Sequence, residues 1–197
     1  MTQMPLPLAY RAAVGERDFF VSEANAVAVR HLDAPPPVTL LTGPEGAGKS
    51  HLARLFAAAT GGRVCDDLDM VPRDEEALFH AWNAARPDAP LLLVARRAPR
   101  DWPVALPDLA SRLAATPTVS IAPPDDALLA AVILKRFRDR GVSVGADVVA
   151  YLVSRIERSF AAAAQTVEAL GAAALAERRP VTVPLARSVL EAQPGLF

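Results

Sequence analysis

The sequence contains a single cysteine, Cys65, so the chain cannot form a disulfide bond within itself. No apolar run approaches about 18 residues, the length that a membrane-spanning helix needs. Residues 1–11 lack the basic start and the apolar stretch of a secretory signal. The formal net charge of −1 gives no overall field that would attract nucleic acid. These absences predict a cytoplasmic protein with no membrane partner, and they argue against a basic nucleic-acid-binding module.

Lysine is also scarce, because two lysines stand against 19 arginines. Arginine and alanine abound together, as is typical of a GC-rich coding sequence, so this bias alone favours no function. The position of each lysine is therefore informative. Apolar residues make up 52% of the 197 residues, which is enough to bury a core in one domain or in two small ones.

The chain divides into three regions. Residues 1–18 are expected to form an extended arm, because Pro5 and Pro7 exclude a helix there. In residues 19–123, amphipathic segments alternate with short apolar runs that are typical of buried parallel strands, at 38–42, 64–65, 91–95 and 118–121. This order predicts an α/β domain with a parallel sheet and helices on both faces. Residues 124–197 show helical spacing alone and predict a small all-helical domain.

Residues 43–50 read GPEGAGKS and match the phosphate-loop pattern G-x-x-x-x-G-K-[ST], between an expected strand and an expected helix. The glycines let successive backbone N–H groups face a phosphate, and the helix adds the positive end of its dipole. Lys49 would bridge the β- and γ-phosphates, and the Ser50 hydroxyl would bind Mg²⁺. The alternative is a glycine-rich turn with an exposed lysine. The residues predicted to bind nucleotide are Gly43, Pro44, Glu45, Gly46, Ala47, Gly48, Lys49 and Ser50.

A phosphate loop also needs a carboxylate at the tip of a neighbouring strand, to hold Mg²⁺ or its water. Asp66 and Asp67 directly follow the expected strand at 64–65. We predict that Asp66 binds magnesium together with Ser50 and that Asp67 has a catalytic role. The alternative is that Asp66, Asp67 and Asp69 form an ordinary acidic turn.

From the phosphate loop onward the chain resembles the AAA+ ATPases of the DnaA group, and within that group the Hda family. GKSHL resembles the GKTHL of the group, and FFVSEANAVA at 19–28 resembles the segment that lines its adenine pocket. Two further stretches carry the resemblance, at 91–113 and 177–190. The resemblance implies a three-layer P-loop core with a helical lid. It also implies ADP or ATP with Mg²⁺, held by the loop together with Phe20, Asn25 and His51.

The resemblance implies an arginine finger as well. Arg112 in DLASRL matches the residue that reaches the γ-phosphate of a nucleotide on a neighbouring subunit. A guanidinium can neutralise the charge that develops during phosphoryl transfer. The neighbouring subunit would be DnaA. The alternative is a solvated surface arginine, one of the many in this chain.

The N-terminal arm resembles the Q-L-x-L-P-L peptide by which the Hda family binds the DNA polymerase sliding clamp. Prolines lower the entropy lost when an extended peptide binds, and apolar side chains anchor it. The alternative is that Leu6 and Leu8 pack on the body of the chain. The residues predicted to bind the clamp are Gln3, Met4, Pro5, Leu6, Pro7 and Leu8.

The sequence departs from the family pattern at several places. Val94 and Ala95 are apolar where a polar sensor residue is usual, and Arg96 stands where an aspartate is common. The lid position that usually offers an arginine to the nucleotide is occupied by Ala161, unless Arg158 or Arg155 replaces it. These departures argue against hydrolysis by the chain itself, but not against nucleotide binding.

Two further departures concern the architecture. Only 15 residues separate Ser50 from Asp66, which leaves no room for an additional strand and helix, so we expect the sheet to lack its usual edge strand. No DNA-binding helix-turn-helix segment follows the lid, so direct sequence-specific DNA binding is not expected.

Together these features predict an adenine-nucleotide-binding regulator of replication initiation. It would dock on the sliding clamp and promote hydrolysis of DnaA-bound ATP, which switches initiation off. Two alternatives remain open at this point. One is a non-catalytic adaptor that tethers a partner to the clamp, and the other is an ATPase in its own right. The contact with DnaA would be head-to-tail and need not close into a ring. A homodimer is a further alternative for the assembly.

Overall fold

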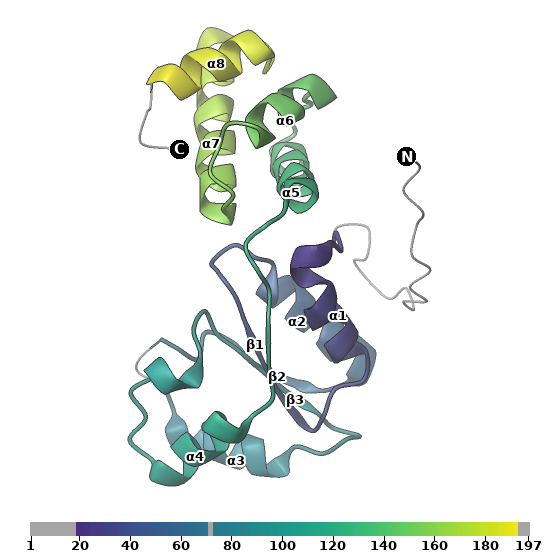
Figure 1. Cartoon of the computed structure of the whole chain (residues 1–197), viewed down its shortest axis with the longest axis vertical. Coiled ribbons are helices and arrows are strands. Elements are labelled where there is room, and N and C mark those ends of the chain that lie inside the picture. The colour runs from purple at the N-terminus through teal and green to yellow at the C-terminus, as the bar shows by residue number, and fades with distance from the viewer. Residues whose placement is uncertain (1–18, 71–72, 193–197) are drawn as a thin grey trace.

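The computed structural model describes residues 19–70 and 73–192 of the chain. Figure 1 shows a sheet-centred body with helices on both faces and a group of helices beyond one end of it. The chain passes from the body to the helical group once, between the last strand and α5 (Asp126–Asp139).

The sheet is parallel and has the order β2-β3-β1-β4. Its strands are β1 (Val38–Thr42), β2 (Arg63–Cys65), β3 (Leu91–Val94) and β4 (Thr118–Ser120). Every residue of β1 and β3 is buried, as expected for the two central strands. The parallel α/β sheet predicted from the sequence is confirmed. Within residues 19–70 and 73–192, β2 is the edge strand beside β3, and no further strand pairs outside it.

The helices of the body form the two outer layers of a three-layer core. On one face, α1 (Glu23–Asp33) and α2 (Lys49–Thr60) pack on Leu41 and Leu92. On the other face, α3 (Glu75–Ala84) and α4 (Pro107–Ala115) pack on Leu40, Leu91 and Leu93. Neighbouring strand residues thus point to opposite faces, so that continuous apolar strands supply both cores.

Helix boundaries in the body follow local capping. Ser22 and Asn25 form a reciprocal capping box at the start of α1. Asp74 caps α3 by accepting the N–H of Ala77. Between β3 and α4 lies a short 3-10 helix, η2 (Pro99–Asp101), which the sequence patterns did not predict. Trp102 follows it and is buried, and its Nε1 donates to the carbonyl of Arg97.

The helical group consists of α5, α6 (Ala146–Val153), α7 (Phe160–Glu177) and α8 (Val183–Ala192). It has a core of its own, built largely from apolar residues at helical spacing such as Leu129, Ile133 and Phe137. Leu128 and Phe160 instead belong to the core that α1 and α2 share with the sheet. The helical group therefore packs on the body through these two side chains, with Val132 partly buried beside them. Of the helices in the described part of the chain, none is long and apolar enough to cross a bilayer.

Candidate nucleotide site

The phosphate loop lies at the carboxyl edge of the sheet, between β1 and α2. Gly43 has φ +152°, and a Cβ placed on it would stand 2.9 Å from the Ile121 carbonyl oxygen and 3.1 Å from the Ile121 Cβ. Only glycine fits here, because both the backbone conformation and the close approach of β4's end exclude a side chain. The loop is therefore fixed against the sheet at its first residue.

Lys49 is buried, with 9% of its surface exposed, beneath the loop. Its Nζ donates to the carbonyl oxygens of Gly43 (2.9 Å) and Pro44 (2.8 Å). Burial lowers the pKa of the Lys49 ammonium; nearby Asp66 opposes this effect and Arg96 adds to it. An ammonium held against a glycine-rich loop at a helix N-terminus is the donor set that a phosphate requires, so the residues present fit a nucleotide's phosphate chain.

The acidic residues after β2 face the same edge of the sheet. Asp66 and Asp67 are both exposed, and the Oδ1 of Asp66 accepts the backbone N–H of Asp67 at 2.8 Å. Asp69 is buried instead, and its Oδ1 accepts the N–H of Arg96 at 3.1 Å. Asp69 therefore joins the segment after β2 to the end of β3. The sequence alone did not predict this structural role for Asp69.

Ser50 stands at the exposed start of α2. In the described residues, no three histidine, cysteine or acidic side chains come together as a preformed metal site. Magnesium held by Ser50 and Asp66 stays a prediction. Those two oxygens suit a cation that keeps most of its ligands as water and phosphate oxygens.

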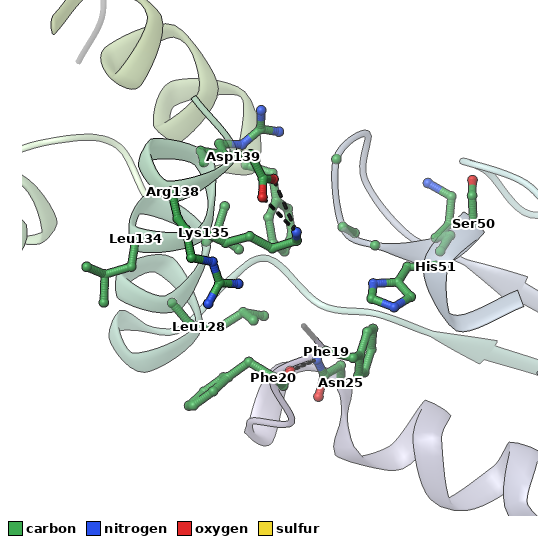
Figure 2. Close-up of a pocket in the computed structure, with 18 of the residues that line it drawn as sticks. Phe19, Phe20, Asn25, Ser50, His51, Leu128, Leu134, Lys135, Arg138 and Asp139 are labelled. Atoms are coloured by element: carbon green, nitrogen blue, oxygen red, sulfur yellow. Dashed lines mark hydrogen bonds and ion pairs between the residues drawn. The ribbon is translucent and has the colours of Figure 1, made fainter. Parts of the chain in front are cut away.

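A cleft of about 1070 Å³ lies between the phosphate loop, the start of α1 and the lid helix α5. Figure 2 shows Phe19, Phe20 and His51 on one side of it and the side chains of α5 on the other. The rings of Phe19 and His51 meet edge to face, with centroids 5.4 Å apart. Leu128 and Val132 add apolar surface from α5. The cleft thus combines an apolar end with the phosphate loop, as a nucleotide with a flat base and a charged tail would need.

Asn25 lines this cleft, but both ends of its amide are engaged within the chain. Its Nδ2 donates to the carbonyl of Phe20 at 2.9 Å, and its Oδ1 accepts the N–H of Ser22 at 2.9 Å. The residue is 2% exposed. Its contribution in this structure is to fix the turn that carries Phe19 and Phe20 into the cleft.

The lid supplies cations that the sequence patterns did not single out. Lys135, Arg136 and Arg138 of α5 line the cleft together with Arg54 of α2. The Nη2 of Arg136 lies 3.8 Å from the place where a Cβ on Gly46 would stand. These residues stand together near the end of α5 in the sequence, but the sequence did not show that this part of α5 borders the cleft.

The two lid arginines considered as replacements at the Ala161 position point elsewhere. Arg158 pairs with Asp126, with its Nε 2.8 Å from Oδ1. The guanidinium of Arg155 lies 3.9 Å from the centre of the Tyr151 ring. Among the described residues that line the cleft, Arg155, Arg158 and Ala161 are all absent.

Arg112 lies on α4, on the face of the sheet opposite to α2, and does not line the cleft. Its guanidinium stacks over two rings of α3, 5.0 Å from the centre of Phe79 and 4.7 Å from that of Trp82. Trp82 is in turn held by a hydrogen bond from its Nε1 to the hydroxyl of Thr116 at 3.1 Å. Arg112 is thus half-buried and held against these two rings, in a place from which it cannot serve the chain's own loop.

The basic residues after β3 are all paired. Arg96 reaches the phosphate-loop residue Glu45 at 2.9 Å, and Arg97 lies 3.7 Å from Asp69. Arg100 has its neighbour Asp101 at 3.9 Å.

The residues predicted to bind the clamp, Gln3 to Leu8, lie outside the described part of the chain.

Comparison with known proteins identifies the lid. Residues 125–190 match the family model described as the Hda lid domain. The lid is therefore Hda-like. Domain III of the Thermotoga maritima replication initiation protein DnaA has a TM-score of 0.69 at 14% identity, covering 89% of this chain and 95% of that one.

Two further solved structures share the fold. One is replication initiator DnaA bound to AMPPCP and single-stranded DNA, with a TM-score of 0.57, 18% identity and coverage of 82% of this chain and 67% of that one. The other is the P216G mutant of Thermotoga maritima RuvB, with a TM-score of 0.60, 13% identity and coverage of 87% and 69%. The AAA+ arrangement of P-loop core and helical lid expected for an Hda-like chain is confirmed.

Proposed function

We propose that the chain is a DnaA-related regulator of replication initiation that binds an adenine nucleotide with Mg²⁺ in its cleft. The observation that carries this proposal is that one cleft is lined both by the phosphate loop with buried Lys49 and by an Hda-type lid, whose Arg136 lies beside Gly46. The replication initiator DnaA of similar fold is bound to AMPPCP, an adenine nucleotide analogue, which supports the ligand class. Its working place would be the cytoplasm, where the chromosome is replicated.

Nucleotide binding is tested by calorimetry with ADP and ATP on the purified chain. Lys49→Ala removes the buried ammonium and is expected to weaken binding at least a hundredfold, because hydrogen bonds from a charged donor are among the strongest in a site. Arg86→Ala is the matched control, since Arg86 pairs only with exposed Asp88, far along the sequence from the loop. Unchanged binding in Lys49→Ala would contradict the proposal, and a preference for ADP would favour the regulator.

We propose further that Arg112 acts in trans, in the nucleotide site of ATP-bound DnaA. Its position opposite α2 and its preformed stacking on Phe79 and Trp82 support this role. With DnaA present, Arg112→Ala should reduce the stimulated hydrolysis about a hundredfold or more, given the size of arginine-finger effects. Arg86→Ala should leave stimulation unchanged. Equal stimulation by Arg112→Ala and the wild type would instead favour the non-catalytic adaptor.

The arm at residues 3–8 is proposed to bind the sliding clamp, with residues 19–123 as the ATPase-type body and 124–197 as the lid. A chain with Leu6→Ala and Leu8→Ala should lose binding to the purified clamp while keeping its nucleotide affinity. If clamp binding and nucleotide affinity are both lost, the two leucines instead pack on the body and stabilise its fold. The chain's own turnover is expected to be weak or nil, and Asp67 would be its catalytic carboxylate. Turnover that Lys49→Ala abolishes would favour an independent ATPase.

A further inference from the structure

Asp125 lies at the point where the chain leaves the body and enters the lid. It precedes α5 with an extended backbone, and its Oδ1 accepts the N–H of Leu128 at 2.7 Å, as the side chain of an N-cap residue does. A carboxylate has two acceptor oxygens, so this cap leaves the second one, Oδ2, for a further donor.

The second oxygen meets the start of another helix. The Oδ2 of Asp125 accepts the N–H of Ala24, in the first turn of α1, at 3.4 Å and across 101 positions of the chain. Ala24 shares this N–H with the Ser22 hydroxyl at 3.2 Å, and its carbonyl accepts the N–H of Ala122 at 2.9 Å. Figure 1 shows α1 beginning beside the passage from β4 to α5. One carboxylate therefore caps α1 and α5 together.

The negative charge of Asp125 suits this place. The starts of two helices bring the positive ends of their dipoles together, and a carboxylate between them is attracted by both. Burial alone would raise the pKa of the Asp125 carboxyl, but hydrogen bonds from the Leu128 backbone and the Ser22 side chain lower that pKa below its ordinary value. Asp125 is therefore ionised at neutral pH, and both of its oxygens can accept at once.

The two capped helices carry opposite walls of the cleft. Figure 2 shows Phe19 and Phe20 on the α1 side and Leu128 on α5, where Val132 adds to the same wall. A flat base in contact with both walls needs them about 7 to 8 Å apart, twice the separation at which carbon atoms attract most strongly. A small change in the spacing of α1 and α5 would therefore change the contacts of the base.

The phosphate end of the cleft is held by other contacts. Gly43 fits closely against Ile121, and Lys49 donates to two carbonyls of the loop. Asp125 takes part in neither contact, and it is absent from the described residues that line the cleft. A change at Asp125 should therefore affect the base more than the phosphates.

We propose that Asp125 is a positioning residue for the nucleotide base: by capping α1 and α5 with one carboxylate, it sets the spacing of the two apolar walls that enclose the base. Without this carboxylate the loop still binds phosphate, but the walls lose their fixed spacing. This inference rests on the proposed nucleotide binding, and it adds a residue that controls affinity for the base from outside the cleft.

The test compares ADP with inorganic pyrophosphate, both with Mg²⁺, by calorimetry, and pyrophosphate is measured by its displacement of ADP. Asp125→Ala should weaken ADP binding about tenfold, the equivalent of two lost caps, and change pyrophosphate affinity by less than about twofold. Asp74→Ala is the matched control. Asp74 caps α3 alone, on the opposite face of the sheet, by accepting the N–H of Ala77, so both affinities should stay unchanged.

Asp125→Asn separates the double cap from an ordinary one. Asparagine is as good an N-cap residue as aspartate, but its side chain offers one acceptor oxygen in place of two. It should cap α5 and keep the lid folded while losing the hydrogen bond from Ala24. ADP should bind this variant about threefold more weakly or worse, with pyrophosphate affinity again unchanged.

The outcomes separate this inference from the proposed function. Wild-type ADP affinity in the Asp125 variants, or equal weakening of ADP and pyrophosphate, would refute the positioning role and leave the nucleotide site standing. If Asp125→Ala binds neither ligand, that protein has lost its fold, and Asp125→Asn decides by the same criterion. If the wild type binds neither ligand, the proposed function fails and this inference fails with it.

Discussion

Replacing Gly43 with alanine should disrupt both the stability of the body and its nucleotide site. The backbone at Gly43 has φ +152°, and the new Cβ would stand 2.9 Å from the backbone oxygen of Ile121. Positive-φ strain costs about 1 to 2 kcal/mol for a residue with a Cβ, and overpacking adds about 1 to 3 kcal/mol. We therefore expect a loss of about 2 to 5 kcal/mol in the free energy of unfolding.

Gly61→Ala provides a matched control for the strain. Gly61 has φ +66° at the end of α2, and nothing lies within 4 Å of a Cβ placed there. Its substitution should therefore cost only the conformational part, about 1 to 2 kcal/mol. The difference between the two variants reports the collision with Ile121 together with the different backbone conformation of Gly43.

The assay is urea denaturation followed by tryptophan fluorescence, which reports the body because Trp82 and Trp102 both belong to its α3–α4 face. ADP affinity is measured in parallel. Equal destabilisation by Gly43→Ala and Gly61→Ala, or an unchanged ADP affinity in Gly43→Ala, would refute the claim that close contact with β4's end holds the loop in its binding shape.

Three further outcomes follow from other contacts. The N–H groups at the start of α4 hold the pKa of the Glu75 carboxyl below its ordinary value, so its stabilising contribution is present above that value and is lost as the pH falls through the lowered pKa. Denaturation at several pH values should therefore show Glu75→Gln less stable than wild type near neutrality, with the gap closing in acid; a constant gap would contradict this. Arg158→Ala breaks an exposed pair with Asp126 and should cost less than about 1 kcal/mol and leave nucleotide affinity unchanged. Arg136→Ala, beside Gly46, should weaken nucleotide binding about tenfold by calorimetry, and an effect no larger than that of Arg158→Ala would exclude a phosphate contact.

Much of the fold could be predicted from the sequence because its signals are local. The apolar runs that became β1 and β3 and the phosphate-loop spacing both depend on neighbouring residues. The short segment between Ser50 and Asp66 predicted that the sheet lacks its usual edge strand. The length of a segment can be counted in the sequence, and 15 residues are too few for an additional strand and helix.

The contacts that complete the site are not local, and the sequence could not predict them. Arg136 reaches the loop because α5 packs across the cleft, and Phe160 does so because α7 starts there. Arg96 meets Glu45 across 51 positions of the chain. Residue type and spacing also did not show that the Asn25 amide forms its hydrogen bonds with the backbone of Phe20 and Ser22.

Phe160 also limits how often the lid can swing away from the loop. Its Cβ stands 3.0 Å from the place of a Cβ on Gly46, and its ring is 2% exposed within the core of the body. Opening the lid would expose this ring to water at a cost of about 2 to 3 kcal/mol. Since about 1.4 kcal/mol corresponds to a tenfold ratio, an open lid would account for at most a few per cent of molecules at equilibrium. A nucleotide would then meet a cleft that the lid covers in nearly all molecules.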